Sequence, residues 1–170
     1  IEFKAYLNNI SKQKNIIIEL AGKVREVLYQ EDTFFKNPKK RLKLRKFPDK
    51  PAELISYDRD NTSGPKKCDY RIYRTNSTNE LEETLTHAYG VRGKVIKKRE
   101  LYMLGRTRIH LDEVKDLGNF IEIEVVLEEG EEEVKGVHTA NELLKKLHIE
   151  DSDLIDCAYI DLLGNNKSSY

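Results

Sequence analysis

Charged and apolar side chains alternate along four short stretches of this chain. Residues 41–45 and 106–112 place Arg, Lys, His or Asp at every second position, with Leu, Ile or Thr between them. Residues 2–4 and 122–124 repeat the alternation with glutamate or lysine around one apolar residue. Because successive side chains of a strand point to opposite faces, each stretch predicts a strand with one charged and one apolar face.

Two kinds of sheet could produce this pattern. An open sheet with its charged face in water explains any single stretch. Four stretches, some rich in cations and others in carboxylates, favour a closed sheet with a charged interior. Eight antiparallel strands can close into such a barrel, with an interior wide enough for one small ligand. Helices would then cover the apolar outer faces.

The periodicity of the whole chain predicts eight strands and four helices in a single α+β domain, residues 1–170. The strands are expected at 2–7, 24–35, 41–47, 53–57, 69–75, 91–104, 106–115 and 119–128. The helices are expected at 11–22, at 77–89 behind a capping box opened by Ser77, from a cap at Thr139 onwards, and at 154–163. Ser152 would cap the last helix and Gly164 would end it, before a frayed tail at 165–170.

Composition narrows the choice of partner and compartment. The 30 basic and 30 acidic residues give no net charge, which argues against a nucleic-acid or membrane-surface partner. Cys68 and Cys157 lie far apart and form no metal-binding spacing, so a reducing, cytoplasmic compartment is the simpler expectation. We recognise no signal peptide, no apolar run long enough for a bilayer and no Gly-rich phosphate loop.

An enclosed interior lined by cations requires an anionic guest. Two unit charges about 4 Å apart interact at roughly 4 kcal/mol at an effective dielectric constant near 20, so clustered cations repel one another strongly. The cations of the predicted charged faces are Lys43, Arg45, Lys97, Arg99 and Arg108. A triphosphate would offset their repulsion, because Arg forms paired hydrogen bonds with phosphate oxygens and Lys supplies a mobile charge.

Carboxylates on the same faces suggest a metal ion. Glu122 and Glu124 lie two residues apart on one strand face, and Glu2 has the same character. Mg²⁺ typically binds one or two protein carboxylates together with substrate phosphates and water. The alternative is that these glutamates pair with the interior cations or face solvent.

The order of the charged motifs is similar to that of a known family. Glu2-Phe3-Lys4 resembles the end of an E-x-E-x-K motif whose first Glu would fall just before Ile1. The other matching stretches are QEDTFF at 30–35, KKRELY at 97–102, LG at 117–118, EIE at 122–124 and CAYIDLL at 157–163. Over nearly its whole length the chain resembles the CYTH superfamily, whose members are also called triphosphate tunnel metalloenzymes, and within it the class IV adenylate cyclase-like branch.

The resemblance implies an eight-stranded antiparallel tunnel that binds a small-molecule triphosphate with Mg²⁺ or Mn²⁺. It implies metal-binding roles for Glu2, Glu122 and Glu124. The implied phosphate-binding residues are Lys4, Lys43, Arg45, Arg59, Lys97, Arg99 and Arg108. Asp112 matches an acidic strand position that helps to position metal or water, so the candidate catalytic residues are Glu122, Glu124, Asp112 and His110.

Several residues of the charged faces allow two interpretations. His110 lies between Arg108 and Asp112, where it could be a general acid or base or a hydrogen-bonding wall residue. Tyr57 could stack on a nucleotide base, although packing is the simpler interpretation. For Tyr102 and Tyr159 we expect packing.

One departure from the family narrows the expected activity. Thiamine triphosphatases of the superfamily have a Tyr where this chain has Phe34, and a Lys on the following strand pair, where residues 53–57 contain none. Hydrolysis of thiamine triphosphate is therefore not expected. We expect hydrolysis of inorganic or nucleoside triphosphate by a monomer or homodimer, because hydrolysis demands less of a base-recognition site and the sequence shows none. The alternatives are a cyclase that makes cyclic AMP and pyrophosphate from ATP, a non-catalytic binder of polyphosphate or nucleotide, and a structural domain with a solvated charged sheet.

Overall fold

The computed structural model describes residues 1–58 and 69–167. Within them the chain forms an α+β fold with one eight-stranded antiparallel sheet and four α-helices, as the sequence predicts. Arg59, Cys68 and the end of the predicted tail lie outside the described residues, and what was predicted for them stays a prediction. No helix of the described residues has the length and apolar character that crossing a bilayer requires.

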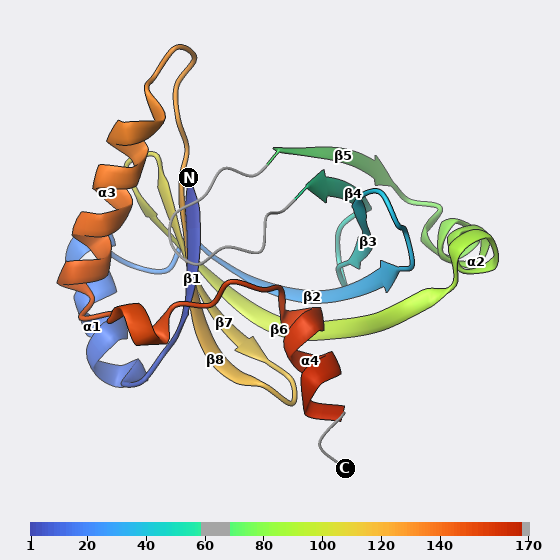
Figure 1. Cartoon of the computed structure of the whole chain (residues 1–170), viewed down its shortest axis with the longest axis horizontal. Coiled ribbons are helices and arrows are strands. Elements are labelled where there is room, and N and C mark those ends of the chain that lie inside the picture. Colours follow the sequence, from blue (N-terminus) through green and yellow to red (C-terminus); the bar gives the residue numbers. More distant parts are fainter. Residues whose placement is uncertain (59–68, 168–170) are drawn as a thin grey trace.

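Eight strands make up the sheet. They are β1 (Glu2–Tyr6), β2 (Glu26–Phe35), β3 (Arg41–Lys46), β4 (Ala52–Asp58), β5 (Asp69–Thr75), β6 (Val91–Leu104), β7 (Thr107–Val114) and β8 (Gly118–Val125). Their order is β1-β8-β7-β6-β2-β3-β4-β5, and the described strands leave β1 and β5 at the two edges. The long strands β2 and β6 curve, so that β3, β4 and β5 lie over them (Figure 1). Closure into a barrel stays a prediction.

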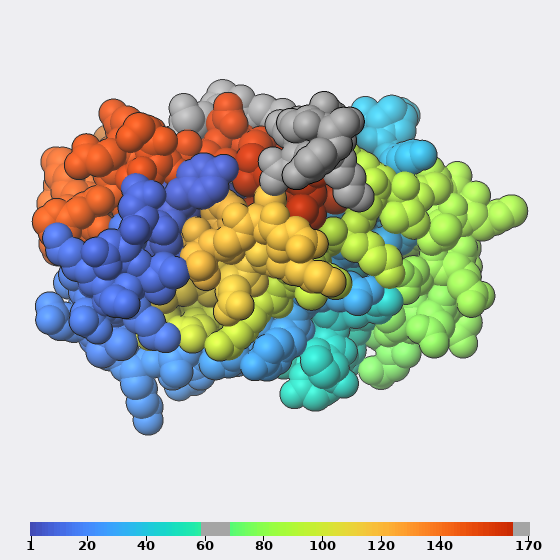
Figure 2. All heavy atoms as spheres, turned by 90° about the horizontal axis from the view of Figure 1, so that it is seen from below, coloured from blue at the N-terminus to red at the C-terminus, as the bar shows by residue number. Residues whose placement is uncertain are grey.

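Three helices cover the outer, convex side of the sheet at the two ends of the molecule. The fourth packs through Tyr159 and Ile160 against Phe34 on the concave side, so the expectation that helices lie only on the outer faces was wrong for it. Helix α1 (Ile10–Ala21) contacts β6, and α3 (Glu133–Lys146) contacts β8. Helix α2 (Thr78–Tyr89) contacts β2 at the opposite end, and α4 (Tyr159–Lys167) contacts β6. Figure 2 shows α1 and α3, in blue and orange, at one end of a continuous body and α2, in light green, at the other.

The main core lies between the strands β1, β6, β7 and β8 and the helices α1 and α3. Phe3, Ile109 and Ile123 are fully buried there and pack with Leu143 and Leu147 of the α3 region. Burying one such side chain contributes about 1.5–3 kcal/mol. The residues between them on each strand point the other way, toward the concave face. The predicted division into an apolar and a charged face is therefore confirmed for the four charged stretches of the sequence.

The third helix begins earlier than the sequence predicts. Helix α3 starts at Glu133, and Thr139 lies in its middle, where its hydroxyl donates to the carbonyl oxygen of Lys135. The first turns of α3 pack closely on the strand side, where a Cβ atom at Gly136 would lie 2.6 Å from Leu127 Cδ2. The interpretation of Thr139 as a cap was therefore wrong.

The fourth helix begins later than predicted because the chain first pairs with β1. Leu154 forms an isolated antiparallel bridge with Ala5, and the amide of Ile155 donates to the carbonyl oxygen of Lys4 at 2.9 Å. These tertiary bonds hold residues 154–155 extended, so α4 starts only at Tyr159.

Helix α2 begins directly after Ser77 and ends at Tyr89, as predicted, but three of the expected end signals act differently in the structure. Ser77 precedes α2 but its side chain makes no capping hydrogen bond. Ser152 lies within the short 3₁₀ turn Asp151–Asp153, which Glu150 and Asp153 cap reciprocally. Gly164 lies inside α4 instead of ending it. Each of these signals is local in sequence, and local propensity is a weak prior against tertiary contacts.

Candidate functional site

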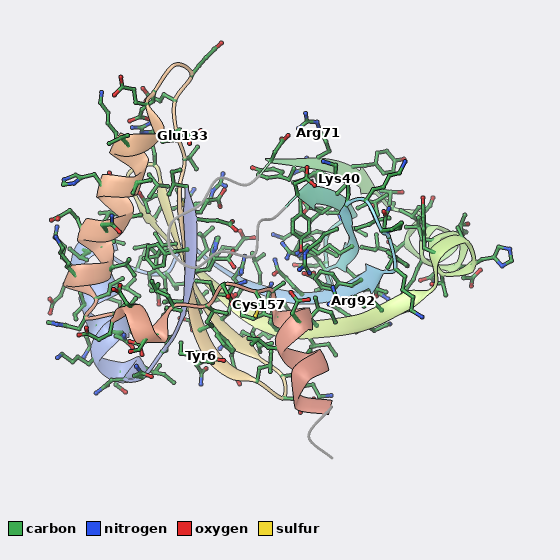
Figure 3. The ribbon with its side chains drawn as sticks, viewed as in Figure 1. Tyr6, Lys40, Arg71, Arg92, Glu133 and Cys157 are labelled. Carbon is green, nitrogen blue, oxygen red and sulfur yellow. The ribbon has the colours of Figure 1, made fainter. Side chains whose placement is uncertain are left out.

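The concave face of the sheet lines a cavity of about 440 Å³. Side chains from all eight strands reach it, together with Ala158 and Tyr159 from the C-terminal segment. Figure 3 shows side chains filling the space between β3–β5 and the curved strands β2 and β6. The predicted site residues that line the cavity are Glu2, Lys4, Lys43, Arg45, Lys97, Arg99, Arg108, His110, Glu122 and Glu124. The structure thus brings together every described residue of the prediction except Asp112.

Asp112 lies behind the cavity wall and binds Arg99. The two residues are opposite each other on β7 and β6, and Arg99 donates from Nε and Nη2 to the two carboxylate oxygens at 2.6 Å each. Tyr159 donates its hydroxyl to Asp112 Oδ2 at 2.7 Å. Burial alone would raise the pKa of Asp112, but the charges of Arg99 and Lys97 lower it to about 2. Asp112 is therefore a fixed anion that orients the Arg99 guanidinium.

A second buried carboxylate, Asp32, was not among the predicted residues. It accepts hydrogen bonds from Arg45 Nε and Nη2, both at 2.7 Å, and from Lys43 Nζ at 3.0 Å. Lys97 Nζ lies 3.9 Å away. Burial would raise the pKa of Asp32, but the charges of Lys43, Arg45 and Lys97 hold it well below its usual value. The carboxylate of Asp32 thus offsets part of the positive charge of these cations even without a bound ligand.

Lys43 lies in a particularly unfavourable place for a charge. Burial and the nearby Arg45 lower its pKa to about 8, although Asp32 acts in the opposite direction. Its ammonium group lies 5.4 Å from the ring centre of Phe34 and 5.5 Å from that of Tyr57. At neutral pH Lys43 therefore keeps its proton, and an anion bound beside it would raise its pKa again.

Glu122 is the carboxylate on which three cavity side chains converge. Lys4 Nζ lies 3.2 Å from Oε2, and Arg99 Nη2 lies 3.4 Å from Oε1. His110 Nδ1 is 3.8 Å from Oε1, beyond hydrogen-bond distance. Burial would raise the pKa of Glu122, but Lys4 and Arg99 hold it well below its ordinary value, so the carboxylate is ionised.

Two buried polar atoms at the cavity have no hydrogen-bond partner in the described part of the chain. They are Oε1 of Gln30 and Nδ1 of His110, and both residues line the cavity. Burial, followed by the charge of Arg99, lowers the pKa of His110, so its imidazole is neutral at neutral pH. Buried polar groups are nearly always hydrogen-bonded, which makes these two atoms natural contacts for a bound ligand or water.

The remaining carboxylates lie near Glu122 on the same face. Glu2 and Glu124 are directly opposite each other in the β1–β8 register, and Arg108 Nη1 donates to Glu124 Oε1 at 3.0 Å. The described residues contain no cluster of three His, Cys, Asp or Glu side chains arranged to hold a metal. Mg²⁺ needs only one or two protein carboxylates when phosphate oxygens and water complete its shell. One or two of the carboxylates Glu2, Glu122 and Glu124 supply the oxygen donors that such an ion needs.

Tyr159 contributes to the site, whereas the sequence suggested packing alone. Besides its hydrogen bond to Asp112, its ring lies 4.0 Å from Lys4 Nζ and 5.3 Å from Lys97 Nζ. Such cation–π contacts are worth about 0.5–2 kcal/mol each. Tyr57 also lines the cavity, whereas Tyr102 is buried in the core and donates to Glu100, in line with the packing expected of it.

The sequence contained a usable signal for Asp32 but hardly one for Tyr159. Asp32 lies two residues from both Gln30 and Phe34 on the same strand, so its side chain points to the same face as theirs. This spacing alone would have predicted that Asp32 points into the cavity. Tyr159 reaches the cavity only because the preceding residues pair with β1, a long-range contact that no local pattern indicates.

Comparison with known proteins identifies the family of this chain. A family model described as the CYTH domain matches residues 1–159. No curated protein matches the sequence. The PH1012 protein from Pyrococcus horikoshii OT3 has a similar structure, with a TM-score of 0.84 and 23% identity over 95% of this chain and 98% of that one.

Two further solved structures carry functional names. One is a “putative adenylate cyclase” from Vibrio parahaemolyticus, with a TM-score of 0.75 and 20% identity over 96% of this chain and 97% of that one. The other is HpAC1 from Hippeastrum, a “putative adenylyl cyclase” described as revealing a dominant triphosphatase activity. It has a TM-score of 0.65 and 15% identity over 97% of this chain and 95% of that one. At these identities the likeness establishes the fold.

Proposed function

The chain belongs to the CYTH domain family, and on that premise we propose that it is a metal-dependent enzyme that hydrolyses a triphosphate in the cavity of its sheet. The observation that carries the proposal is the convergence of buried and half-buried cations from three strands on one cavity that also contains carboxylates. The cations of that group are Lys43 and Arg45 of β3, Lys97 and Arg99 of β6, and Lys4 of β1. A phosphate chain is the guest whose charge and acceptor oxygens match them.

The proposed tunnel is a closed form of the curved sheet. The edge strands β1 and β5 support this idea, because Glu2 and Lys4 of the first and Tyr70, Ile72 and Arg74 of the second line the same cavity. A cavity reached from both edges surrounds its ligand. Enclosure lowers the local dielectric and strengthens each contact between cation and phosphate.

Each side chain has a separate part in the proposed reaction. Arg45 and Arg99 hold phosphate oxygens in line, and Asp112 keeps the Arg99 guanidinium oriented. Glu2, Glu122 and Glu124 would hold Mg²⁺ or Mn²⁺, which would neutralise phosphate charge and orient the reacting oxygens.

In the proposed hydrolysis, water attacks the terminal phosphorus, the new P–O bond forms and the bridging P–O bond breaks, so diphosphate leaves. Neutral His110 accepts the proton of the attacking water.

A phosphate-release assay tests this proposal directly. The chain is supplied with tripolyphosphate, ATP or thiamine triphosphate, each with Mg²⁺ and with Mn²⁺, and released phosphate is measured by malachite green. We expect turnover of tripolyphosphate or ATP. Tight tripolyphosphate binding without turnover would instead support a non-catalytic binder, and neither binding nor turnover would support a structural domain.

An adenylate cyclase is the second candidate, because one part of the cavity is apolar and aromatic. Phe47, Tyr57, Tyr70 and Ile72 line it beside the cations, and aromatic rings offer a stacking surface for a base. The names carried by the Vibrio and Hippeastrum proteins point in the same direction. In this reaction the ribose 3′-hydroxyl attacks the α-phosphate and pyrophosphate leaves. Chromatographic detection of cyclic AMP from ATP would distinguish it from hydrolysis.

A further inference from the structure

Asp32 lies at the centre of three cations that line the cavity. In the register of the sheet it is directly opposite Arg45, and it is diagonal to Lys43 on β3 and to Lys97 on β6. Long side chains at diagonal positions of a sheet reach one another. The hydrogen bonds of Asp32 to Arg45 and Lys43, and its 3.9 Å contact with Lys97, therefore follow from the pairing of β2 with its two neighbours.

We propose that Asp32 is a positioning residue, whose carboxylate holds these three cations in the arrangement that receives the phosphate chain. This inference rests on the function proposed above, because that function assigns the three cations to phosphate. Asp32 acts through the cations and makes no direct contact with phosphate, since two anions at contact distance repel each other.

The geometry leaves the positioned cations able to bind a second anion. Asp32 occupies Nε and Nη2 of Arg45, and the other terminal nitrogen, Nη1, takes no part in that fork. The ammonium group of Lys43 has three donors, of which one points to Asp32. Each cation is thus fixed in place by one set of donors and can present another set to a ligand.

The electrostatic surroundings of Lys43 show what Asp32 contributes. The charged groups that act on Lys43 are Arg45 of β3, Arg99 of β6 and Asp32 of β2, with the rings of Phe34 and Tyr57 beside it. Burial and both arginines lower the pKa of Lys43, whereas Asp32 raises it. Removing the Asp32 charge should therefore move the pKa of Lys43 below its present value of about 8.

The first test measures Lys43 without any substrate. In protein labelled with carbon-13 at lysine Cε, the Lys43 signal is identified by its loss in Lys43→Arg and is then titrated in the wild type, Asp32→Asn and Glu31→Gln. We expect the Lys43 pKa to fall by about 1 unit or more in Asp32→Asn. Glu31→Gln is the matched control, because Glu31 is the next residue of β2 but points outward, where it pairs with Lys46 and Lys94.

The second test separates positioning from a purely structural role. Asp32→Asn should raise KM for tripolyphosphate by about tenfold or more and should lower kcat by a smaller factor. The reason is that the cations that bind the substrate are no longer held in place by a carboxylate. Asp32→Glu keeps the charge but moves the carboxylate, so it should restore the Lys43 titration while KM stays raised. Circular dichroism melting curves confirm that each variant is folded.

An unchanged Lys43 titration in folded Asp32→Asn would overturn the inference. An unchanged KM in Asp32→Glu would do the same, and this second variant decides the matter if Asp32→Asn does not fold. The proposed function fails separately, if the wild type releases no phosphate from tripolyphosphate. In that case the affinity for tripolyphosphate is measured by calorimetry in place of KM. A lower affinity in Asp32→Asn than in the wild type would still support the positioning role.

Discussion

Two arginines of the cavity are held by the same kind of fork. Arg45 donates from Nε and Nη2 to Asp32, and Arg99 donates from Nε and Nη2 to Asp112. Paired hydrogen bonds between a guanidinium and a carboxylate fix the plane as well as the place of the cation. The two forks lie on adjacent parts of the sheet and give the cavity two rigid guanidinium groups. A lysine at either position could not reproduce this geometry.

At Glu122 we expect the glutamine variant to lose turnover and keep the fold. The substitution preserves size but removes the charge that faces Lys4 and Arg99 and that would bind the metal. Phosphate release from tripolyphosphate should fall by at least about a hundredfold, an energy of roughly 3 kcal/mol in the transition state. Glu113→Gln on β7 is the control, since that side chain is exposed on the outer face. Unaltered turnover in Glu122→Gln would remove the metal assignment.

The titration of Lys43 predicts a pH dependence of binding. Its pKa of about 8 means that the ammonium form predominates below that pH and is lost as the pH rises through it. Calorimetric affinity for tripolyphosphate should therefore decline between about pH 7 and pH 9, by up to roughly tenfold per unit. Lys43→Arg should bind equally well across this range, because a guanidinium stays protonated. An identical decline in the arginine variant would refute the assignment to Lys43.

The sequence predicted correctly that several charged side chains on regular strands point into the cavity. Lys43, Arg45, Arg99 and Glu122 line the cavity because side-chain direction on a strand alternates strictly with position. The sequence also led us to expect a strongly repelling set of cations. It could not indicate which carboxylates compensate them, because the pairing of Asp32 with β3 depends on the register between strands and not on any one segment.

At the scale of elements, the two glycines of the C-terminal helices lie in different surroundings. Gly136 of α3 lies against Leu127 and Ile1, and a Cβ atom there would come within 2.6 Å and 2.8 Å of their side chains. At Gly164 of α4, no atom of the described residues lies within 4 Å of the same position. The two residues share the low helix propensity of glycine and differ in the space around them.

Alanine at these two glycines should have opposite effects on stability. Gly164→Ala should raise the free energy of unfolding by about 0.5–1 kcal/mol through helix propensity alone. Gly136→Ala gains the same propensity but must displace packed side chains, which costs about 1–3 kcal/mol, so its net effect is destabilising. Urea unfolding of both variants measures the difference. A stabilised Gly136→Ala would show that α3 can move away from the strands at little cost.

Elements were predictable where the pattern was strong and local. The limits of β5 and β6 agree with the sequence-based expectation, and β6 lies between Gly90 and Gly105, two glycines at positive φ that mark its ends. The start of α4 did not agree, since residues 154–155 are held extended by β1. Helix caps were the least predictable feature, as Thr139 and Ser152 illustrate.

For the molecule as a whole, a zero net charge conceals a strong separation of charge. The 30 basic and 30 acidic residues balance over the chain, yet cations outnumber carboxylates among the described residues that line the cavity. The excess of cations in the cavity can therefore attract a polyanion, although the protein as a whole carries no net charge that would do so. Since Lys4, Lys97 and Arg99 of the cavity are buried, salt should weaken its binding less than that of an exposed basic patch.

Tripolyphosphate should stabilise the whole fold on binding. A ligand at about 100 times its dissociation constant adds roughly 2.7 kcal/mol, which for a chain of this size raises Tm by several degrees. The measurement is a thermal shift with tripolyphosphate, compared with monophosphate and sulfate at equal ionic strength. Equal shifts with all three anions would mean that the cavity does not select a phosphate chain.

The pairing of β1 with β8 has a consequence for synthesis on the ribosome. Strand β1 is made first, but its hydrogen-bonding partner lies more than a hundred residues later, and Tyr159 follows later still. Glu2 and Lys4 therefore have no neighbouring strand to pair with until β8 has been made, and contacts so distant in sequence form slowly. A nascent chain can form the other strands first, but it cannot bind a phosphate compound in a complete site before β8 and Tyr159 have left the ribosome.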